Sequence, residues 1–143
     1  MTCECDDLRA ILALLALNAK HYNAGQWGEY GSLFTEDGVL HVFGRDYVGR
    51  DAIARFSARR DRGKHMMSTP IIEIDGESAT VSVDHVFFRY PDLVLFGAGT
   101  YEDDLVKVNG EWKFARREIV VHGHHADMTA VSKQEVAPIG DAV

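Results

Sequence analysis

The sequence predicts an α+β domain in which a curved, mostly antiparallel sheet wraps around about three N-terminal helices and encloses a pocket. Apolar side chains recur at helical spacing in the first part of the chain. From residue 65 onward the pattern changes to four long runs that are typical of strands. Turn-forming pairs separate these runs at Asp75-Gly76, Pro91-Asp92 and Asn109-Gly110. Helices followed by a meander of strands are the layout of an α+β domain.

Three segments are expected to form the helices. Apolar spacing predicts a first helix over residues 6–24, which begins with two aspartates and ends at Gly25. A short second helix is expected at residues 27–34, before a turn at residues 36–38. A third helix is expected over residues 51–60, where apolar side chains again share one face. A long curved sheet can wrap around these helices.

A hairpin and four long strands are expected to make up the sheet. Residues 39–43 and 47–48 predict the hairpin, which turns at Gly44-Arg45-Asp46. The long strands are expected at residues 65–74, 79–90, 93–108 and 112–122. The residues beyond 126 show no clear period. We therefore expect one domain over residues 1–125 and a C-terminal tail over residues 126–143.

The composition argues against several classes of protein. A chain of 143 residues with 46% apolar content suits one domain with a sizeable core. No run of about 18 apolar residues is present, so no membrane contact is expected. The N-terminus is acidic where a signal peptide is basic, and we expect a cytoplasmic protein. The net charge of −7 and the scattered cations argue against nucleic-acid binding.

One local group of cations nevertheless stands out in this acidic chain. It places five basic residues within ten positions: Arg55, Arg59, Arg60, Arg62 and Lys64. Such a basic cluster can bind an anionic ligand or partner, or it can be the solvated face of a helix. The sequence leaves both interpretations open.

Neither a metal nor another cofactor is expected. Three histidines lie close together in the sequence at His122, His124 and His125, but no HExxH pattern accompanies them. Cys3 and Cys5 form half of a metal-binding pattern, and no second cysteine pair completes it. The chain has no GxSxG, P-loop or GxGxxG motif, which argues against serine hydrolases, nucleotide hydrolysis and dinucleotide binding.

Three segments carry a resemblance to a known group of proteins. Residues 22–38 read YNAGQWGEYGSLFTEDG, residues 99–102 read GTYE, and residues 110–114 read GEWKF. Together with the order of the elements over residues 6–122, they resemble the SnoaL-like group of the nuclear transport factor 2-like superfamily. This resemblance implies a cone-shaped fold with a deep apolar pocket. Members of that superfamily range from dehydratases and isomerases to binding proteins without chemistry.

His65 is the candidate general base. The chain resembles the scytalone dehydratase, dehydrochlorinase and ketosteroid isomerase-like members of the superfamily. The place of His65 at the start of a strand looks like that of the histidine in the scytalone dehydratase and dehydrochlorinase branch, where it acts as the general base. Imidazole titrates near neutrality and suits this role. In that branch an aspartate near the end of the first helix orients and charges the histidine, whereas this chain has Asn23. A neutral amide can hydrogen-bond the ring but cannot stabilise an imidazolium by its charge.

The ligand contacts are expected from the pocket wall. Alternation along residues 81–89 places His85 and Phe87 on the face that looks inward, where His85 is either a ligand contact or a hydrogen-bonded core histidine. The expected ligand-binding residues are Tyr22, Trp27, Met67, His85 and Phe87. Trp27 also has the spacing of a core residue. The acidic run at residues 102–104 is interpreted as a solvated strand end or a salt-bridged sheet face.

The function that these features favour is a cofactor-independent lyase or isomerase. In this dehydratase-like hypothesis His65 acts as base on a small, apolar, oxygenated molecule, and Asn23, Tyr22 or His85 holds a substrate oxygen. The alternative is a non-catalytic domain for small-ligand binding or association. A homodimer is also expected, because four residues suggest that apolar side chains reach both faces of the sheet: Val94, Phe96, Ile119 and Val121.

Overall fold

The computed structural model describes residues 3–126 of the chain. Three helices lie in this part of the chain: α1 (Glu4–Ala24), α2 (Trp27–Ser32) and α3 (Arg50–Ala58). The strands are β1 (Phe34–Val42), β2 (Arg45–Val48), β3 (Gly63–Met67), β4 (Ile71–Asp75), β5 (Ser78–Arg89), β6 (Val94–Val108) and β7 (Glu111–His124). The expected tail lies outside the described residues, apart from Ala126.

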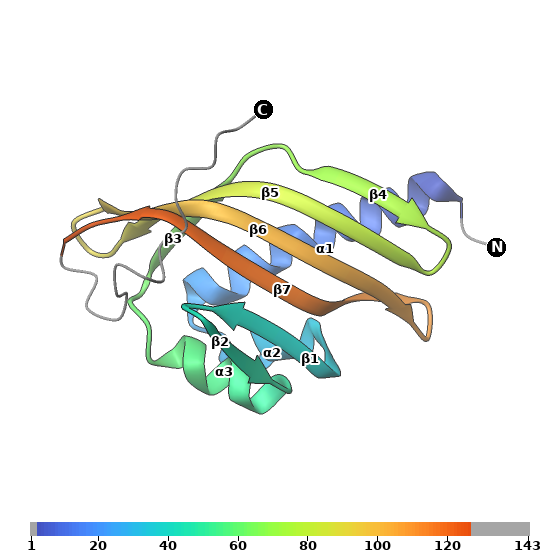
Figure 1. Cartoon of the computed structure of the whole chain (residues 1–143), viewed down its shortest axis with the longest axis horizontal. Coiled ribbons are helices and arrows are strands. Elements are labelled where there is room, and N and C mark those ends of the chain that lie inside the picture. Colours follow the sequence, from blue (N-terminus) through green and yellow to red (C-terminus); the bar gives the residue numbers. More distant parts are fainter. Residues whose placement is uncertain (1–2, 127–143) are drawn as a thin grey trace.

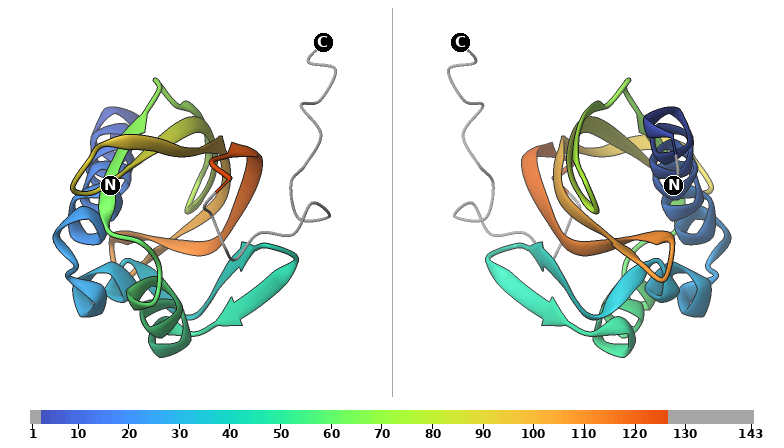
Figure 2. Two further views of the ribbon diagram at one scale, coloured as in Figure 1. Left: turned by 90° about the vertical axis from the view of Figure 1, so that its left-hand side faces the viewer. Right: turned by 90° about the vertical axis from the view of Figure 1, so that its right-hand side faces the viewer.

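All of these strands belong to one sheet. Its order is β2-β1-β7-β6-β5-β3, and β4 pairs with β5 beyond the end of β3. The pairs are antiparallel except for β1 and β7, which run parallel. The long strands curve across α1 (Figure 1), and the end-on views show the sheet curling around with α1 along its open side (Figure 2). The fold is the expected α+β arrangement of helices inside a curved, mostly antiparallel sheet.

Helix α1 is held at both ends. It starts two residues earlier than its sequence pattern predicts, after Cys3, and ends at Gly25, whose φ of 71° suits glycine. Near its start, the indole nitrogen of Trp112 donates a hydrogen bond of 2.9 Å to Asp7. This contact fixes α1 against the start of β7.

None of the helices in residues 3–126 has the length and apolar character needed to span a membrane.

The strand boundaries differ from the expected ones at several points, most clearly in β1, which includes the turn expected at residues 36–38, and after β3. Phe34, expected in the second helix, begins β1 and pairs with Phe114, and its side chain is fully buried. Tertiary burial overrides the short helical pattern there. The expected strand over residues 65–74 is two strands, β3 and β4, with residues 68–70 between them. Pro70 has no N–H group for a sheet ladder, so the pairing with β5 breaks and resumes at Ile71.

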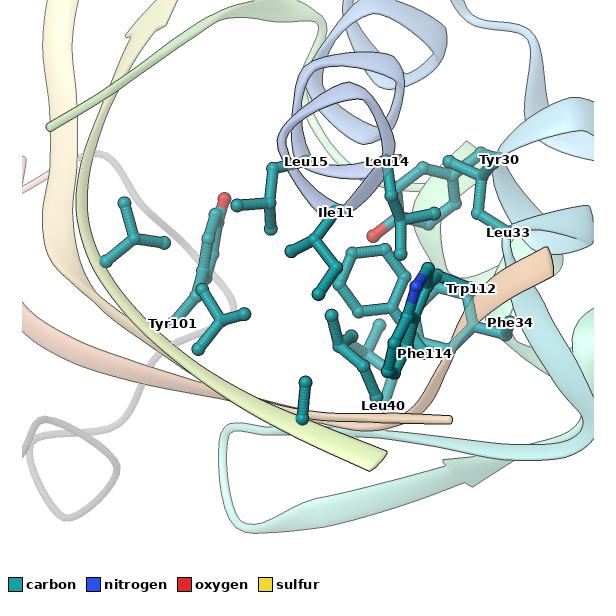
Figure 3. Close-up of a cluster of buried hydrophobic side chains, with 14 of the residues drawn as sticks. Ile11, Leu14, Leu15, Tyr30, Leu33, Phe34, Leu40, Tyr101, Trp112 and Phe114 are labelled. Carbon is teal, nitrogen blue, oxygen red and sulfur yellow. The ribbon is translucent and has the colours of Figure 1, made fainter. Parts of the chain in front are cut away.

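The core fills the space between the inner face of the sheet and the helices (Figure 3). Its larger side chains include Ile11, Leu14 and Leu15 of α1 and the aromatic residues Tyr30, Phe34, Trp112 and Phe114. Tyr101 stands on the sheet side of this group with its hydroxyl toward α1 (Figure 3). The cluster adjoins the candidate site, and Tyr30, Leu40, Val42 and Tyr101 belong to both.

The structure changes the argument for a homodimer. Phe96 and Val121 are buried, and Ile119 packs against the core, so these three side chains face inward rather than outward. These three therefore supply no apolar outer face, whereas Leu95 of β6 is 52% exposed, so an apolar side chain does reach the surface there. Val94 is half-buried. The homodimer itself stays a prediction.

Candidate functional site

A cavity of about 100 Å³ lies between the C-terminal half of α1, the end of α3 and the inner face of the sheet. For comparison, an apolar cavity of roughly 150 Å³ holds a benzene molecule. The volume is smaller than this and than the few hundred Å³ of a typical ligand pocket, so even a ligand with a single ring must extend partly through the mouth. The polar side chains in its wall are Asn18, Tyr22, Tyr30, Ser57, Arg60, Asp61, His65, His85 and Tyr101.

His65 reaches this cavity from β3 and is held by Asn23 of α1. The amide oxygen Oδ1 of Asn23 lies 3.0 Å from the backbone nitrogen of His65 and 3.0 Å from its Nδ1. A backbone N–H can only donate, so the side-chain atom of Asn23 at this point must be its oxygen. That oxygen can only accept, so Nδ1 must carry the proton of the neutral ring. The lone pair of His65 therefore sits on Nε2.

The surroundings keep the His65 ring neutral. Burial, with smaller contributions from the nearby His85 and Arg117, lowers its pKa to about 3. The ring sits among aromatic neighbours, with the Tyr22 and Phe87 ring centres each 4.6 Å away. At neutral pH, His65 is thus an uncharged imidazole with an available lone pair.

His85 lies beside it on β5. The two imidazole centres are 6.4 Å apart, and the His85 ring stacks on Tyr101 at 3.9 Å and 8°. Burial lowers the pKa of His85 to about 3, with smaller contributions from Arg117 and His122. Its Nδ1 is buried and has no hydrogen-bond partner within residues 3–126. A buried polar atom in a cavity wall is a natural contact for a ligand atom or a bound water.

Tyr22 occupies the centre of the aromatic part of the wall. Its ring makes edge contacts with Trp27 at 5.0 Å and with Tyr30 at 5.6 Å. Its hydroxyl makes a weak hydrogen bond of 3.4 Å to the backbone oxygen of Asp61. Burial raises the pKa of Tyr22 above its ordinary value, so the phenol stays protonated and can donate.

Of the other three expected ligand contacts, one lines the cavity and two do not. Phe87 lines the cavity together with Tyr22 and His85. Trp27 is absent from the cavity wall, and its half-buried ring makes an edge contact with Tyr22. Met67 lies in a different groove between α1 and β3, which also exposes Asn23 and one side of His65. The structure therefore brings His65, His85, Tyr22 and Phe87 to one cavity.

The sequence reasoning missed a buried ion pair beneath this cavity. Arg117 of β7 donates to both carboxylate oxygens of Asp103 at 2.7 and 2.8 Å, and the two side chains are 1% and 0% exposed. The guanidinium also donates to Asn18 and lies 3.9 Å from the Tyr101 ring centre. Asp103 is thus salt-bridged on the inner face of the sheet, within the core, rather than at a solvated strand end. Its neighbours Glu102 and Asp104 are exposed.

Opposing effects act on the protonation of this pair. Burial by itself lowers the pKa of Arg117, but the charge and hydrogen bonds of Asp103 outweigh this effect. The net pKa is raised, so the guanidinium stays charged. Burial raises the pKa of Asp103, and Arg117 opposes that rise. Arg117 of this pair places a fixed positive charge near both histidines. This charge is one reason why their rings stay neutral.

The histidines near the end of β7 do not gather into a cluster. His122 Nε2 lies 3.3 Å from the hydroxyl of Thr100, and His124 Nδ1 contacts the backbone oxygen of His125. Within residues 3–126, no three His, Cys, Asp or Glu side chains gather in a way that could hold a metal ion.

Comparison with known proteins decides the family. Residues 4–118 match the model of the SnoaL-like domain. The chain belongs to the SnoaL-like domain family. A comparison of this SnoaL-like chain with curated proteins finds no match.

Solved structures share its fold. An aspartate-to-asparagine variant of a protein of unknown function from Mycobacterium tuberculosis is 26% identical, with a TM-score of 0.79 over 91% of this chain and 79% of that chain. A candidate scytalone dehydratase from Novosphingobium aromaticivorans is also 26% identical, with a TM-score of 0.75 over 97% of each chain. An NTF2-like protein with a cystatin-like fold from the same organism is 22% identical, with a TM-score of 0.77 over 85% of this chain and 86% of that chain.

Proposed function

We propose that this SnoaL-like chain is a cofactor-independent lyase or isomerase of the dehydratase type, acting on a small, apolar, oxygenated molecule. One observation carries the proposal: the neutral His65 ring lines the cavity, and Asn23 fixes its Nδ1–H so that the lone pair is on Nε2. A positioned base in a mostly apolar cavity suits the removal of a proton from carbon. The similarity to the candidate scytalone dehydratase favours the same class of reaction.

The proposed reaction begins with proton transfer to His65. Its Nε2 accepts a proton from a carbon next to the substrate carbonyl, and the electrons of that C–H bond form the C=C bond of an enolate. In an isomerisation, the imidazolium returns the proton to another carbon. In a dehydration, the enolate expels a β-hydroxyl group, which leaves as water after taking the proton from His65.

The wall offers contacts for the oxygen on which negative charge develops. The Tyr22 phenol stays protonated and can donate to that oxygen. His85 lines the same wall, and its unpartnered Nδ1 can donate when it carries the ring proton. Because Asn23 carries no charge, it stabilises the imidazolium of His65 only weakly. This favours substrates whose C–H bond is already acidified by a neighbouring carbonyl group.

Exchange of carbon-bound hydrogen for deuterium tests the proposal directly. Small cyclic β-hydroxy ketones would be incubated with the protein in D₂O, and NMR would follow exchange next to the carbonyl and loss of water. His65→Gln keeps hydrogen-bonding capacity but removes the base, so the rate should fall by about 10²–10⁴-fold. His21→Gln, at the C-terminal end of α1 beside Gln26, is the matched control and should exchange at the wild-type rate. Equal rates in wild type and His65→Gln would rule out this residue as the base.

The alternative is a domain that binds a small ligand without turning it over. The neutral Asn23 favours it, because the histidine has no anionic partner at this position. This function would give saturable binding of the same ketones with no exchange above the uncatalysed rate. Titration calorimetry on samples used for the exchange measurement separates the two functions.

A further inference from the structure

The basic cluster identified in the sequence divides in the structure. Four of its members are exposed: Arg55, Arg59, Arg62 and Lys64. Arg60 is half-buried and lies in the wall of the cavity, next to Phe56 and Ser57 of α3. It follows Arg59, the residue that caps α3, so the end of this helix directs one cation toward the cavity and its neighbour away.

Two aromatic rings hold the Arg60 guanidinium. Its central carbon lies 4.9 Å from the centre of the Phe43 ring and 5.8 Å from that of Phe56. Phe56 in turn stacks on Tyr47 at 4.0 Å. These contacts are made with aromatic rings, so they give the N–H groups no oxygen or nitrogen acceptor. The arginine is thus fixed in place without using its hydrogen-bond donors.

These donors have no protein partner in the described part of the chain. No ion pair or hydrogen bond involves the Arg60 side chain within residues 3–126. Other arginines differ, because Arg62 donates to the backbone oxygen of Asn23 and Arg117 is paired with Asp103. The adjacent Asp61 also lines the cavity, but its exposed carboxylate makes no ion pair with Arg60. A half-buried, aromatic-held cation with unused donors is suited to a ligand anion.

We infer that Arg60 is a specificity-determining residue that binds a carboxylate on the substrate, so that the cavity takes a small cyclic carboxylic acid with its ring inside and its carboxylate at the mouth. This inference rests on the proposed function, which makes the cavity the substrate site. The planar guanidinium matches a carboxylate through two parallel hydrogen bonds. The cavity volume of about 100 Å³ suits a single ring that partly emerges at the mouth. Arg59 and Arg62 are exposed and lie within two residues of Arg60, so their charges favour anions near it despite the net charge of −7.

Binding of benzoate and of its neutral analogue benzamide tests this inference by titration calorimetry. Wild type should bind benzoate at least ten-fold more tightly than benzamide, and its benzoate affinity should fall as salt rises. Arg60→Gln should lose roughly ten-fold or more of the benzoate affinity and little of the benzamide affinity. Arg60→Lys should recover part of the loss because it keeps the charge. Arg59→Gln removes a neighbouring charge outside the cavity and is the matched control.

Three results would overturn the inference. They are the absence of benzoate binding to wild type at millimolar concentration, equal benzoate affinity in wild type and Arg60→Gln, and an equal loss in Arg59→Gln and Arg60→Gln. The last result would mean that only the general field of the basic cluster acts. Benzoate binding is measured without turnover, so it can succeed where the exchange experiment fails, and failure of the catalytic proposal and failure of this one are distinguishable.

Discussion

Acidification should destabilise this protein through its two cavity histidines. His65 and His85 have a pKa of about 3 in the folded chain, against an ordinary value of 6.5. Between these values the unfolded chain binds two protons that the folded chain does not, so stability decreases as pH falls through this window. Above pH 6.5 neither state binds them, and the two residues cause no further change.

The size of the effect follows from the width of this window. Each pKa unit corresponds to about 1.4 kcal/mol, so lowering the pH from 7 to 5 costs about 2 kcal/mol at His85. The half-buried His65 contributes at most a similar amount. Their sum, about 4 kcal/mol or less, is a large share of the roughly 5–15 kcal/mol that stabilise a typical domain.

Urea unfolding at pH 7, 6 and 5 measures this effect. The free energy of unfolding would be compared between wild type and the variants His65→Gln, His85→Gln and the double variant. Contributions from carboxylates are common to all four proteins and cancel in the comparison. His85→Gln should lose about 2 kcal/mol less than wild type between pH 7 and pH 5. Parallel pH dependence in wild type and the double variant would refute the reasoning.

Three further predictions concern the site, the ion pair and the assembly. Asn23→Asp should raise the pKa of His65 by placing an anion beside it, so a pH–rate profile should show higher turnover near neutrality and a new decline toward acid pH. Asp103→Ala should cost about 3–5 kcal/mol because it leaves Arg117 buried without its partner, whereas the exposed neighbour Asp104→Ala should change stability by about 0.5 kcal/mol or less. Urea unfolding measures both, and equal losses would contradict the assignment of Asp103 to the core. Light scattering at micromolar concentration should give the mass of a homodimer, and a monomeric mass would argue against it.

Local patterns and turn residues predicted most of the fold. The helix over 4–24 and the strand ends near Gly76 and Gly110 follow from periodicity and turn chemistry, which act over a few residues. The contact between Asn23 and His65 followed from resemblance, since residues so far apart in sequence have no local pattern that joins them.

The ion pair beneath the cavity could not be predicted in this way. Trp112 and Phe114 point inward, so strict alternation along β7 places residues 116, 118 and 120 inside and Arg117 outside. The pairing with β6 skips Ala115, because Leu105 pairs with Phe114 and Asp104 with Arg116. This one-residue bulge reverses which side chains face inward. Single-sequence alternation carries no sign of such a bulge.

The bulge at Ala115 exchanges the inward-facing and outward-facing positions along the rest of β7. Before it, even-numbered residues face the helices; after it, odd-numbered residues do, and these include Arg117, Ile119 and Val121. An ungapped alignment with a relative that lacks the extra residue would therefore match pocket-wall positions here with outer-surface positions there. Functional residues on this strand should be transferred between relatives by the pairing with β6 rather than by sequence position.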